Sequence, residues 1–510
     1  MNQREFIHEF NDEFRPKFNM DFFRRSDDDL IQALRHVVYS CERESVFTIK
    51  VLSFEVIDGY DDINHILWSY EESIINKNKN PNAEDRLKKQ SSSTGKKKDN
   101  QFAYINLKDS DLKLIKVTYY IEINEKKDGL VHDTITVYIA IPRIVDNFYF
   151  RLNGNVYSAI YQIVDASTYN NSAAKNAKKQ SVTFKSIFMA TRCYRYYGKL
   201  VDINEHNIPA IYFIANIFRK SLLLIKYFLA KFGFYGTMAF LHLKDIFILR
   251  DPIDLGDESV RERFYIFPVR NKFVICCPKI MYDSIQICQS FVYTLHSVLN
   301  YMVDAEFPDV FGSEIYIKAL GAEFATKDLS VVFTKGLNIL CSLEFIYDGI
   351  TREDLMLPDE DKADVYRVLR WLMYEFNALR QKDNLDISTK KIRYAEYIAS
   401  YYATKLATGI YRISDKGERA DLNTMRKALQ IPPMYLINAI TKCQLVNYKN
   451  IVNDLDAIIA LKYTYKGISG IGEKANAISN AYRSIHPSHL GRVDIDTSSN
   501  SDPGVTKHVA

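Results

Sequence analysis

The sequence is poor in glycine and proline and has no cysteine-pairing motif. Its 510 residues include only 19 Gly and 13 Pro, about half the usual share, which excludes collagen-like and low-complexity chains. The 7 cysteines contain no CxxC pair. They fit neither a disulfide framework nor a zinc ribbon, so we expect free thiols in a reducing compartment.

Charge of one sign and long apolar runs are also lacking. The net charge is +4, too small to indicate nucleic-acid binding by itself, so any basic surface must be local. The most apolar region, 208–249, is interrupted by Lys and Arg. No uncharged stretch there reaches the ~18 residues needed to span a membrane. The N-terminus has no signal-peptide core. We therefore expect a soluble protein without a membrane partner.

Local patterns predict a chain that mixes strands and helices. A helix is expected over 26–43, followed by strands over 46–57, 114–123 and 134–141. Residues 148–163 predict two strands that meet at Asn153-Gly154, the strongest short hairpin signal. Further along the chain, the patterns predict helices over 283–303, 363–379, 391–407, 423–429 and 434–445. The absence of a fixed period excludes solenoids and propellers.

Two stretches concentrate positive charge. Residues 76–101 carry eight Lys/Arg against three Asp/Glu, and residues 166–201 carry seven Lys/Arg and no acid. Both are interpreted as solvated loops, with nucleic-acid contact as the alternative. The alternation of Tyr with Arg192 and Arg195 favours that alternative for the second stretch, since rings stack on bases while cations bind phosphates.

Common catalytic motifs are missing, and three short motifs are weak. The sequence has no Walker loop, nucleophile elbow, HExxH or dinucleotide fingerprint. The glycines of 467–472 could hold a phosphate or form a plain loop. Asp494 and Asp496 could bind Mg²⁺, although D-x-D is frequent by chance. His486 and His489 could suggest zinc, but the proline between them breaks the helix that such a pair needs.

The segment around these histidines carries a specific resemblance. Residues 483–492 read Arg-Ser-Ile-His-Pro-Ser-His-Leu-Gly-Arg, which closely resembles the R-x-[IV]-H-P-[ST]-H-x-G-R segment of the β subunit of multisubunit DNA-directed RNA polymerases. Residues 148–163 resemble the family's F-x-I-N-G hairpin with the V-x-x-S-Q that follows it. Residues 386–396 are similar to its N-R-R-[IV]-R-x-x-G-E segment, with Lys390-Lys391 in place of Arg-Arg. The three occur in the family's order.

The resemblance implies the N-terminal half of a naturally split β subunit, of the type found in jumbo bacteriophages. The chain ends near the midpoint of a full β subunit, and the family's Glu-Thr-Pro-Glu-Gly is only partly reproduced at 496–504. The implied fold class is α+β and multidomain, with a protrusion and a lobe followed by the start of the fork. The implied domains are an N-terminal segment (1–19), the protrusion (20–165 and 380–450), the lobe (166–379), and the fork region with a C-terminal tail (451–510).

The same resemblance implies a subunit of a nucleotidyltransferase that has no activity alone. It would form one wall of the DNA cleft and position template, non-template strand and nucleotide. No catalytic residue and no cofactor are expected on this chain, because Mg²⁺ would be held by a β′-like partner. Further partners would be the β C-terminal-half subunit, a promoter-specificity factor, the DNA template and the RNA transcript. The expected location is the host-cell cytoplasm during infection, with packaging in the virion left open.

The implied site residues fall into two groups. Cations placed near nucleic acid or the active centre are Lys466, Lys474, Arg483 and Arg492 from the fork, with Arg192 and Arg195 from the basic stretch. Residues expected to pack the fork are His486, Pro487, His489 and Gly491. Two other functions stay open. One is a non-enzymatic nucleic-acid-binding or phage structural protein, and the other is a stand-alone nucleotidyltransferase that uses Asp494 and Asp496.

Overall fold

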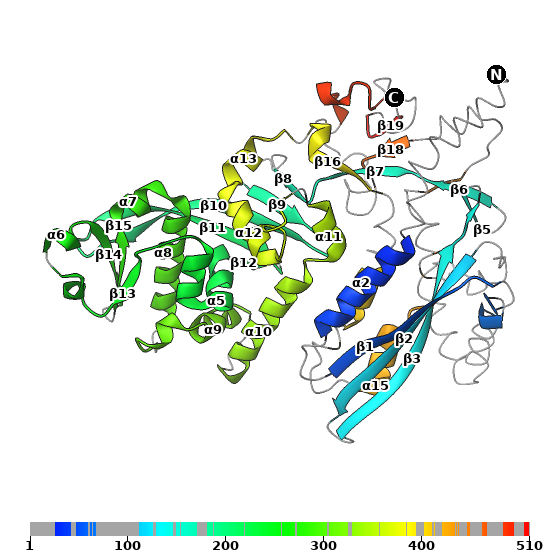
Figure 1. Cartoon of the computed structure of the whole chain (residues 1–510), viewed down its shortest axis with the longest axis horizontal. Helices are drawn as coiled ribbons and strands as arrows, with labels where there is room; N and C mark the ends of the chain where they lie inside the picture. Colours follow the sequence, from blue (N-terminus) through cyan, green and yellow to red (C-terminus); the bar gives the residue numbers. More distant parts are fainter. Residues whose placement is uncertain are drawn as a thin grey trace, which may run out of the picture. The chain divides into compact units, whose positions relative to one another are not determined.

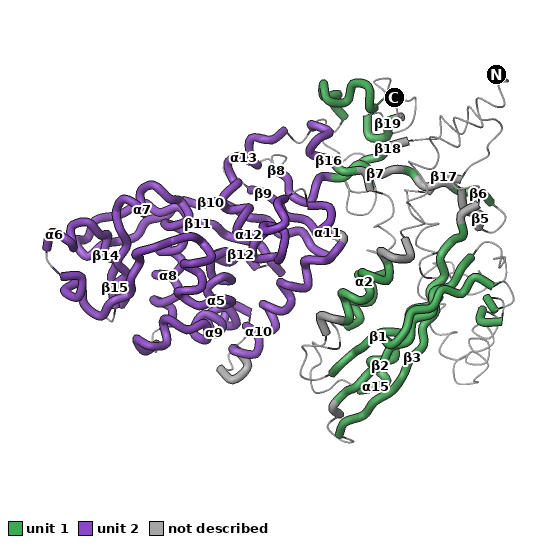
Figure 2. Tube along the Cα trace, viewed as in Figure 1, with its two compact units in different colours: residues 1–164, 391–510 green, residues 165–390 purple. Residues whose placement is uncertain are grey.

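The chain folds into two compact units. The computed structural model describes residues 26–67, 112–170, 181–393, 402–413, 421–437, 446–448, 462–466, 483–493 and 504–508, with short gaps inside the longer ranges. The first unit comprises 1–164 and 391–510, and the second comprises 165–390 (Figure 2). Each combines helices with several sheets, so the expectation of a mixed helix-and-sheet chain is confirmed. The basic stretch 76–101 lies outside the described residues.

The first unit contains a long antiparallel sheet formed by β1 (Phe47–Ile57), β2 (Leu112–Glu125) and β3 (Gly129–Pro142) (Figure 1). In β2, Val117, Tyr119 and Ile121 are fully buried and alternate with half-exposed residues, which is the period expected of a strand with one face in a core. Helix α2 (Ser26–Cys41) packs on β1, and α15 (Leu422–Leu429) packs on β3. The predicted helices and strands of this region are confirmed.

A second sheet of this unit confirms the predicted hairpin. Its strands are β4 (Ile144–Val145), β5 (Tyr149–Leu152), β6 (Asn155–Ala159) and β17 (Val446–Tyr448), in the order β17-β6-β5-β4. Leu152 pairs with Asn155 across a two-residue turn, and the turn residues Asn153 and Gly154 lie outside the described residues.

The second unit is built on a five-stranded antiparallel sheet. Its strands, in the order β12-β11-β10-β9-β8, are β8 (Thr168–Asn170), β9 (Ser181–Lys185), β10 (Ala190–Val201), β11 (Asn207–Ile217) and β12 (Lys220–Leu223). The interpretation of 166–201 as a solvated loop is therefore wrong over β8, β9 and β10. Buried Thr191 and Cys193 alternate with exposed Arg192 in β10, so the charges occupy the outer positions of a strand.

Helices and a smaller sheet complete the second unit. The smaller sheet has the order β13-β15-β14 and contains β13 (Phe247–Leu249), β14 (Phe264–Val269) and β15 (Phe273–Pro278). The α-helices are α5 (Leu224–Phe240), α6 (Glu258–Arg261), α7 (Lys279–Ser284), α8 (Gln286–Tyr301), α9 (Glu314–Ala322), α10 (Leu329–Phe345), α11 (Gly349–Asp354), α12 (Val365–Tyr374) and α13 (Phe376–Gln381). Short 3-10 turns occupy Pro252–Leu255, Asp309–Phe311 and Ile387–Thr389. Across the described ranges, no helix combines the length and the apolar character needed to span a bilayer.

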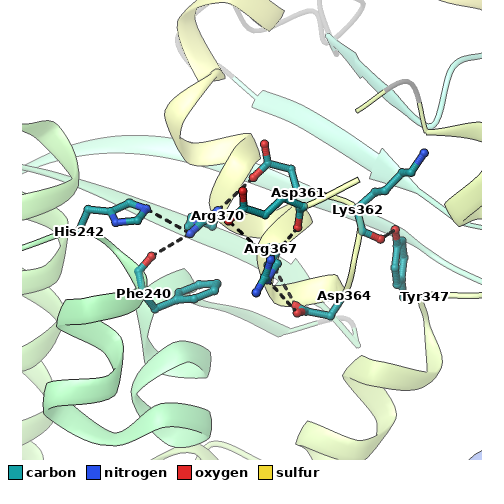
Figure 3. A network of polar contacts seen from close by, with 9 residues as sticks. Phe240, His242, Tyr347, Asp361, Lys362, Asp364, Arg367 and Arg370 are labelled. Atoms are coloured by element: carbon teal, nitrogen blue, oxygen red, sulfur yellow. Dashed lines mark hydrogen bonds and ion pairs between the residues drawn. The ribbon is translucent and has the colours of Figure 1, made fainter. Parts of the chain in front are cut away.

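Two contacts inside the second unit show how tightly its helices are fixed. Helices α9 and α10 touch through their backbones, since a side chain at Gly321 would overlap the carbonyl of Val332. In the middle of α12, Arg370 donates to the Phe240 carbonyl at 3.1 Å and pairs with Asp361 at 3.0 Å (Figure 3). The same guanidinium lies 4.9 Å from the Phe240 ring centroid. One arginine thus satisfies the C-terminal end of α5 and joins it to α12.

The helix predicted over 391–407 begins later than expected. Residues Lys390–Arg393 form strand β16, and the described helical residues run over 402–410. The local pattern was overridden by pairing, because β16 lies beside β7 (Tyr161–Asp165) in a four-stranded sheet and Lys390 forms an ion pair with Asp165.

Candidate nucleic-acid interface

One small sheet joins segments that lie far apart in the sequence. Its order is β16-β7-β18-β19, with β18 at Lys462–Thr464 and β19 at Thr506–His508 (Figure 1). Strand β7 ends the 148–163 segment and β16 lies in the 386–396 segment. Strands β18 and β19 flank the 483–492 segment in the sequence. The three segments that carry the polymerase resemblance are therefore neighbours around one sheet.

The backbone next to Lys466 is fixed from β7. Gln162 is fully buried, and its Nε2 donates to the Lys466 carbonyl at 2.9 Å. Thr464 pairs with Gln162 in the parallel ladder, and its Oγ1 accepts from the Lys466 N–H at 3.2 Å. The Lys466 side chain is half-exposed, so a rigid main chain presents a cation at the end of β18.

The 483–493 segment is held by its own histidines. His486 precedes the turn Pro487–His489, and its Nδ1 accepts from the Ser488 N–H at 3.2 Å. Proline suits the first position of such a turn, where a backbone N–H would have no partner. The main-chain N–H groups of Arg492 and Val493 both donate to the His489 carbonyl, at 3.1 and 2.9 Å. These hydrogen bonds fix the main-chain conformation of the segment.

A buried lysine supports this segment from β19. Lys507 is 6% exposed, and its Nζ lies 3.4 Å from both His489 Nδ1 and the Ser484 carbonyl. The His486 N–H also donates to His489 Nδ1, at 3.4 Å. That nitrogen can accept only while it carries no proton, so neutral His489 has its proton on Nε2. Burial lowers the pKa of Lys507, because a low-dielectric site disfavours the charged ammonium.

Two glycines allow the close packing of this region. Gly491 and Gly504 have φ of +70° and +77°, which L side chains rarely adopt. A Cβ at Gly504 would lie 2.8 Å from the Arg483 carbonyl oxygen and 2.9 Å from its Cα, whereas a Cβ at Gly491 would meet nothing within 4 Å. The Gly504 backbone therefore packs directly against that of Arg483.

The outer positions of the segment carry the predicted cations. Arg492 is exposed and Arg483 is half-exposed, while His489 between them is buried. Within the described ranges, no carboxylate forms an ion pair with Arg492. Packing thus buries His489 and leaves the Arg492 side chain toward solvent, an arrangement suited to anions such as phosphates.

The two arginines of β10 differ in their surroundings. Arg192 is exposed. Arg195 donates to Asn377 Oδ1 at 2.7 Å, lies 3.4 Å from Gln286 Oε1, and has its guanidinium 5.2 Å from the Phe376 ring centroid. Arg195 therefore joins β10 to α8 and α13, and Arg192 is the better placed of the two to reach a ligand.

Several predicted positions lie outside the described residues. These are Lys474, the glycines of 467–472, Asp494 and Asp496. In the part of the chain that the structure describes, no group of three or more His, Cys, Asp or Glu could hold a metal ion. The sequence placed Gly504 at the end of the partly reproduced 496–504 segment without giving it a role, and it did not indicate Lys507.

A local basic surface is typical of proteins that bind nucleic acids. The chain belongs to the non-virion RNA polymerase subunit family, whose model matches residues 49–510. It is thus a phage RNA polymerase subunit that acts with other polymerase subunits. The non-virion class also answers the question left open by the sequence, because it implies the infected cell as the location. No curated protein matches the chain.

Proposed function

We propose that this chain is the β N-terminal-half subunit of a split, multisubunit DNA-dependent RNA polymerase of the jumbo-phage type. The first unit would supply the protrusion and the fork, and the second unit would supply the lobe. Its role would be to form one wall of the DNA cleft and to position template, non-template strand and nucleotide. Family membership supports the polymerase role.

The observation that carries the β assignment is the sheet β16-β7-β18-β19. The three resembling segments were identified separately in the sequence, and chance matches would have no reason to meet. They lie around one sheet, with buried Gln162 bonded to the main chain of Lys466. Such contacts between distant segments are what a shared ancestral fold would preserve.

In this proposal the chain positions nucleic acid and a partner performs the chemistry. Phosphoryl transfer by two Mg²⁺ ions depends on aligned reactants. Arg483, Arg492 and Lys466 would contact phosphates, while His486 and His489 maintain the loop between the arginines. Magnesium would be held by the β′-like subunit, and the remaining partners would be the β C-terminal half and a promoter-specificity factor.

The proposal is tested by tagging the chain in infected cells and purifying it with its partners. The purified complex should contain separate chains for the β C-terminal half and the β′-like Mg²⁺ site, identified by mass spectrometry. It should make RNA from a DNA template with Mg²⁺, and the isolated chain should make none. RNA synthesis by the isolated chain would contradict the proposal, as would a complex that lacks the two expected subunits.

A further inference from the structure

The five-stranded sheet of the second unit carries a row of tyrosines on one face. Ring centroids are 6.2 Å apart for Tyr194 and Tyr196 on β10, and 5.9 Å apart for Tyr196 and Tyr212 on β11. Tyr212 stacks on Tyr293 of α8 at 4.2 Å, with only 1° between the ring planes. All four rings are half-exposed. We call these four residues the tyrosine row.

Strand alternation separates the row from the buried residues that lie next to it on β11. On β11, Phe213, Ala215 and Ile217 are buried, whereas Tyr212 is half-exposed. The antiparallel register puts Tyr196 directly opposite Tyr212, so both rings stand on the side away from Phe213. Leu200 and Ala210 on that side are buried, so the rings occupy its half-exposed part. An outer sheet face ordinarily carries polar side chains. A series of half-exposed rings there is unusual, and such rings can stack on the bases of a nucleic acid.

A glycine makes the row possible. A Cβ at Gly198 would lie 2.9 Å from the Tyr212 ring and 3.1 Å from the Tyr293 ring. The position therefore has to lack a side chain for the two rings to lie parallel over β10. The row depends on this specific backbone approach, and it joins a helix to the sheet.

The charge of the sheet favours an anionic ligand. Its five strands contain no Asp or Glu. The register places Lys185 and Arg192 on the face of the row, and Arg195, Lys199 and Lys220 on the other face. Arg192 is exposed two residues before Tyr194, on the same face as the row. Among the described residues it forms no ion pair. An aromatic face with cations and without acids is complementary to a polyanion that has flat rings.

We propose that the tyrosine row and Arg192 bind a single-stranded segment of nucleic acid, with bases stacked on the rings and a phosphate at Arg192. A duplex hides its base faces inside the stack, and only an unpaired strand offers them to a protein. The ligand class rests on the proposed polymerase function, in which strands are separated. The location and the residues come from the geometry of the sheet.

The test measures binding of a fluorescent oligothymidylate to the purified full-length chain. Tyr196→Leu should weaken binding about tenfold to a hundredfold, because base–aromatic stacking contributes that much per base. Tyr196→Phe keeps the ring and should bind like the unmodified chain. Tyr197→Leu is the matched control, since Tyr197 is the next residue, is 68% exposed and stands on the opposite face.

Photocrosslinking with 5-iododeoxyuridine locates the contact. Crosslinked peptides should contain Tyr194, Tyr196 or Tyr212, and a duplex of the same sequence should crosslink much less. Arg192→Ala should reduce the salt dependence of binding by ~0.7 per lost phosphate contact. Equal binding by Tyr196→Leu and Tyr197→Leu, or crosslinks confined to other segments, would overturn the proposal.

Two further results separate this proposal from the polymerase function. A complex that makes RNA but shows no oligonucleotide contact at the tyrosine row would contradict the proposed binding site and leave the polymerase function supported. If Tyr196→Leu loses a co-purifying protein while oligonucleotide binding is unchanged, the face is a protein interface and the proposal is wrong. Failure of RNA synthesis by a complex with the expected subunits, with crosslinks at the row intact, would count against the polymerase function alone.

Discussion

Substitution of Gly504 tests whether the backbone just before β19 fixes the Arg483–Arg492 segment. Alanine at this position must adopt φ near +77°, which costs ~1–2 kcal/mol. Its Cβ would also lie 2.8–3.0 Å from three atoms of Arg483, and such overpacking costs ~1–3 kcal/mol. The total is about 2–5 kcal/mol of local stability.

Gly491→Ala is the matched control. It lies in the same segment with φ of +70° and meets nothing within 4 Å, so it incurs only the backbone cost of ~1–2 kcal/mol. The difference between the variants is ~1–3 kcal/mol, which corresponds to a change of about fivefold to 150-fold in the equilibrium constant for local opening of the segment.

Amide hydrogen exchange measures this opening directly. The N–H groups of Leu490 and Val493 donate to the carbonyls of Pro487 and His489, at 3.2 and 2.9 Å, and report whether the segment is closed. Both variants should exchange faster than the unmodified chain, and Gly504→Ala should be the faster of the two by the stated factor. Equal acceleration of exchange in the two variants would contradict this prediction, because the contact between Gly504 and Arg483 would then contribute nothing to the stability of the segment.

Three further predictions concern the cations, a histidine and a helix contact. Arg483→Ala and Arg492→Ala should each slow elongation by the purified polymerase about tenfold to a hundredfold without loss of subunits, because a charge-assisted hydrogen bond contributes ~1.5–3 kcal/mol; unchanged elongation would refute the phosphate contacts. Burial lowers the pKa of His296 from 6.5, so the unfolded chain binds more protons and the free energy of unfolding should fall as pH decreases below 6.5; denaturant titrations should show a flatter pH profile for His296→Gln. Gly321→Ala should lower the free energy of unfolding by ~1–3 kcal/mol or more, and an unchanged denaturation midpoint would contradict the backbone contact between α9 and α10.

The sequence predicted secondary structure best where the residues of a single strand or turn determine it. In β2, apolar residues alternate with polar ones because one face of the strand lies in a core, so the period was visible. The Asn153-Gly154 pair likewise encodes its hairpin locally, through backbone conformations that few other residues tolerate. Both predictions were confirmed.

The sequence did not predict the structure correctly where tertiary contacts determine it. In β10, the charged and aromatic residues at the outer positions concealed the alternation of Thr191 and Cys193, so the strand was interpreted as a loop. The pairing of β7 with β18 joins residues about 300 positions apart, and no local pattern encodes it. The burial of Lys507 and the stack of Tyr212 on Tyr293 are equally long-range, which is why the sequence indicated the cations and the histidines of the 483–492 segment but neither of these contacts.

The most direct test of the β assignment is an omission experiment. The polymerase subunits identified by co-purification would be co-expressed with and without this chain, and Mg²⁺-dependent RNA synthesis from a phage promoter template would be measured for both preparations. We predict full-length transcripts only when the chain is present, and restored synthesis when the purified chain is added back. Equal synthesis without the chain would contradict its role as a wall of the DNA cleft.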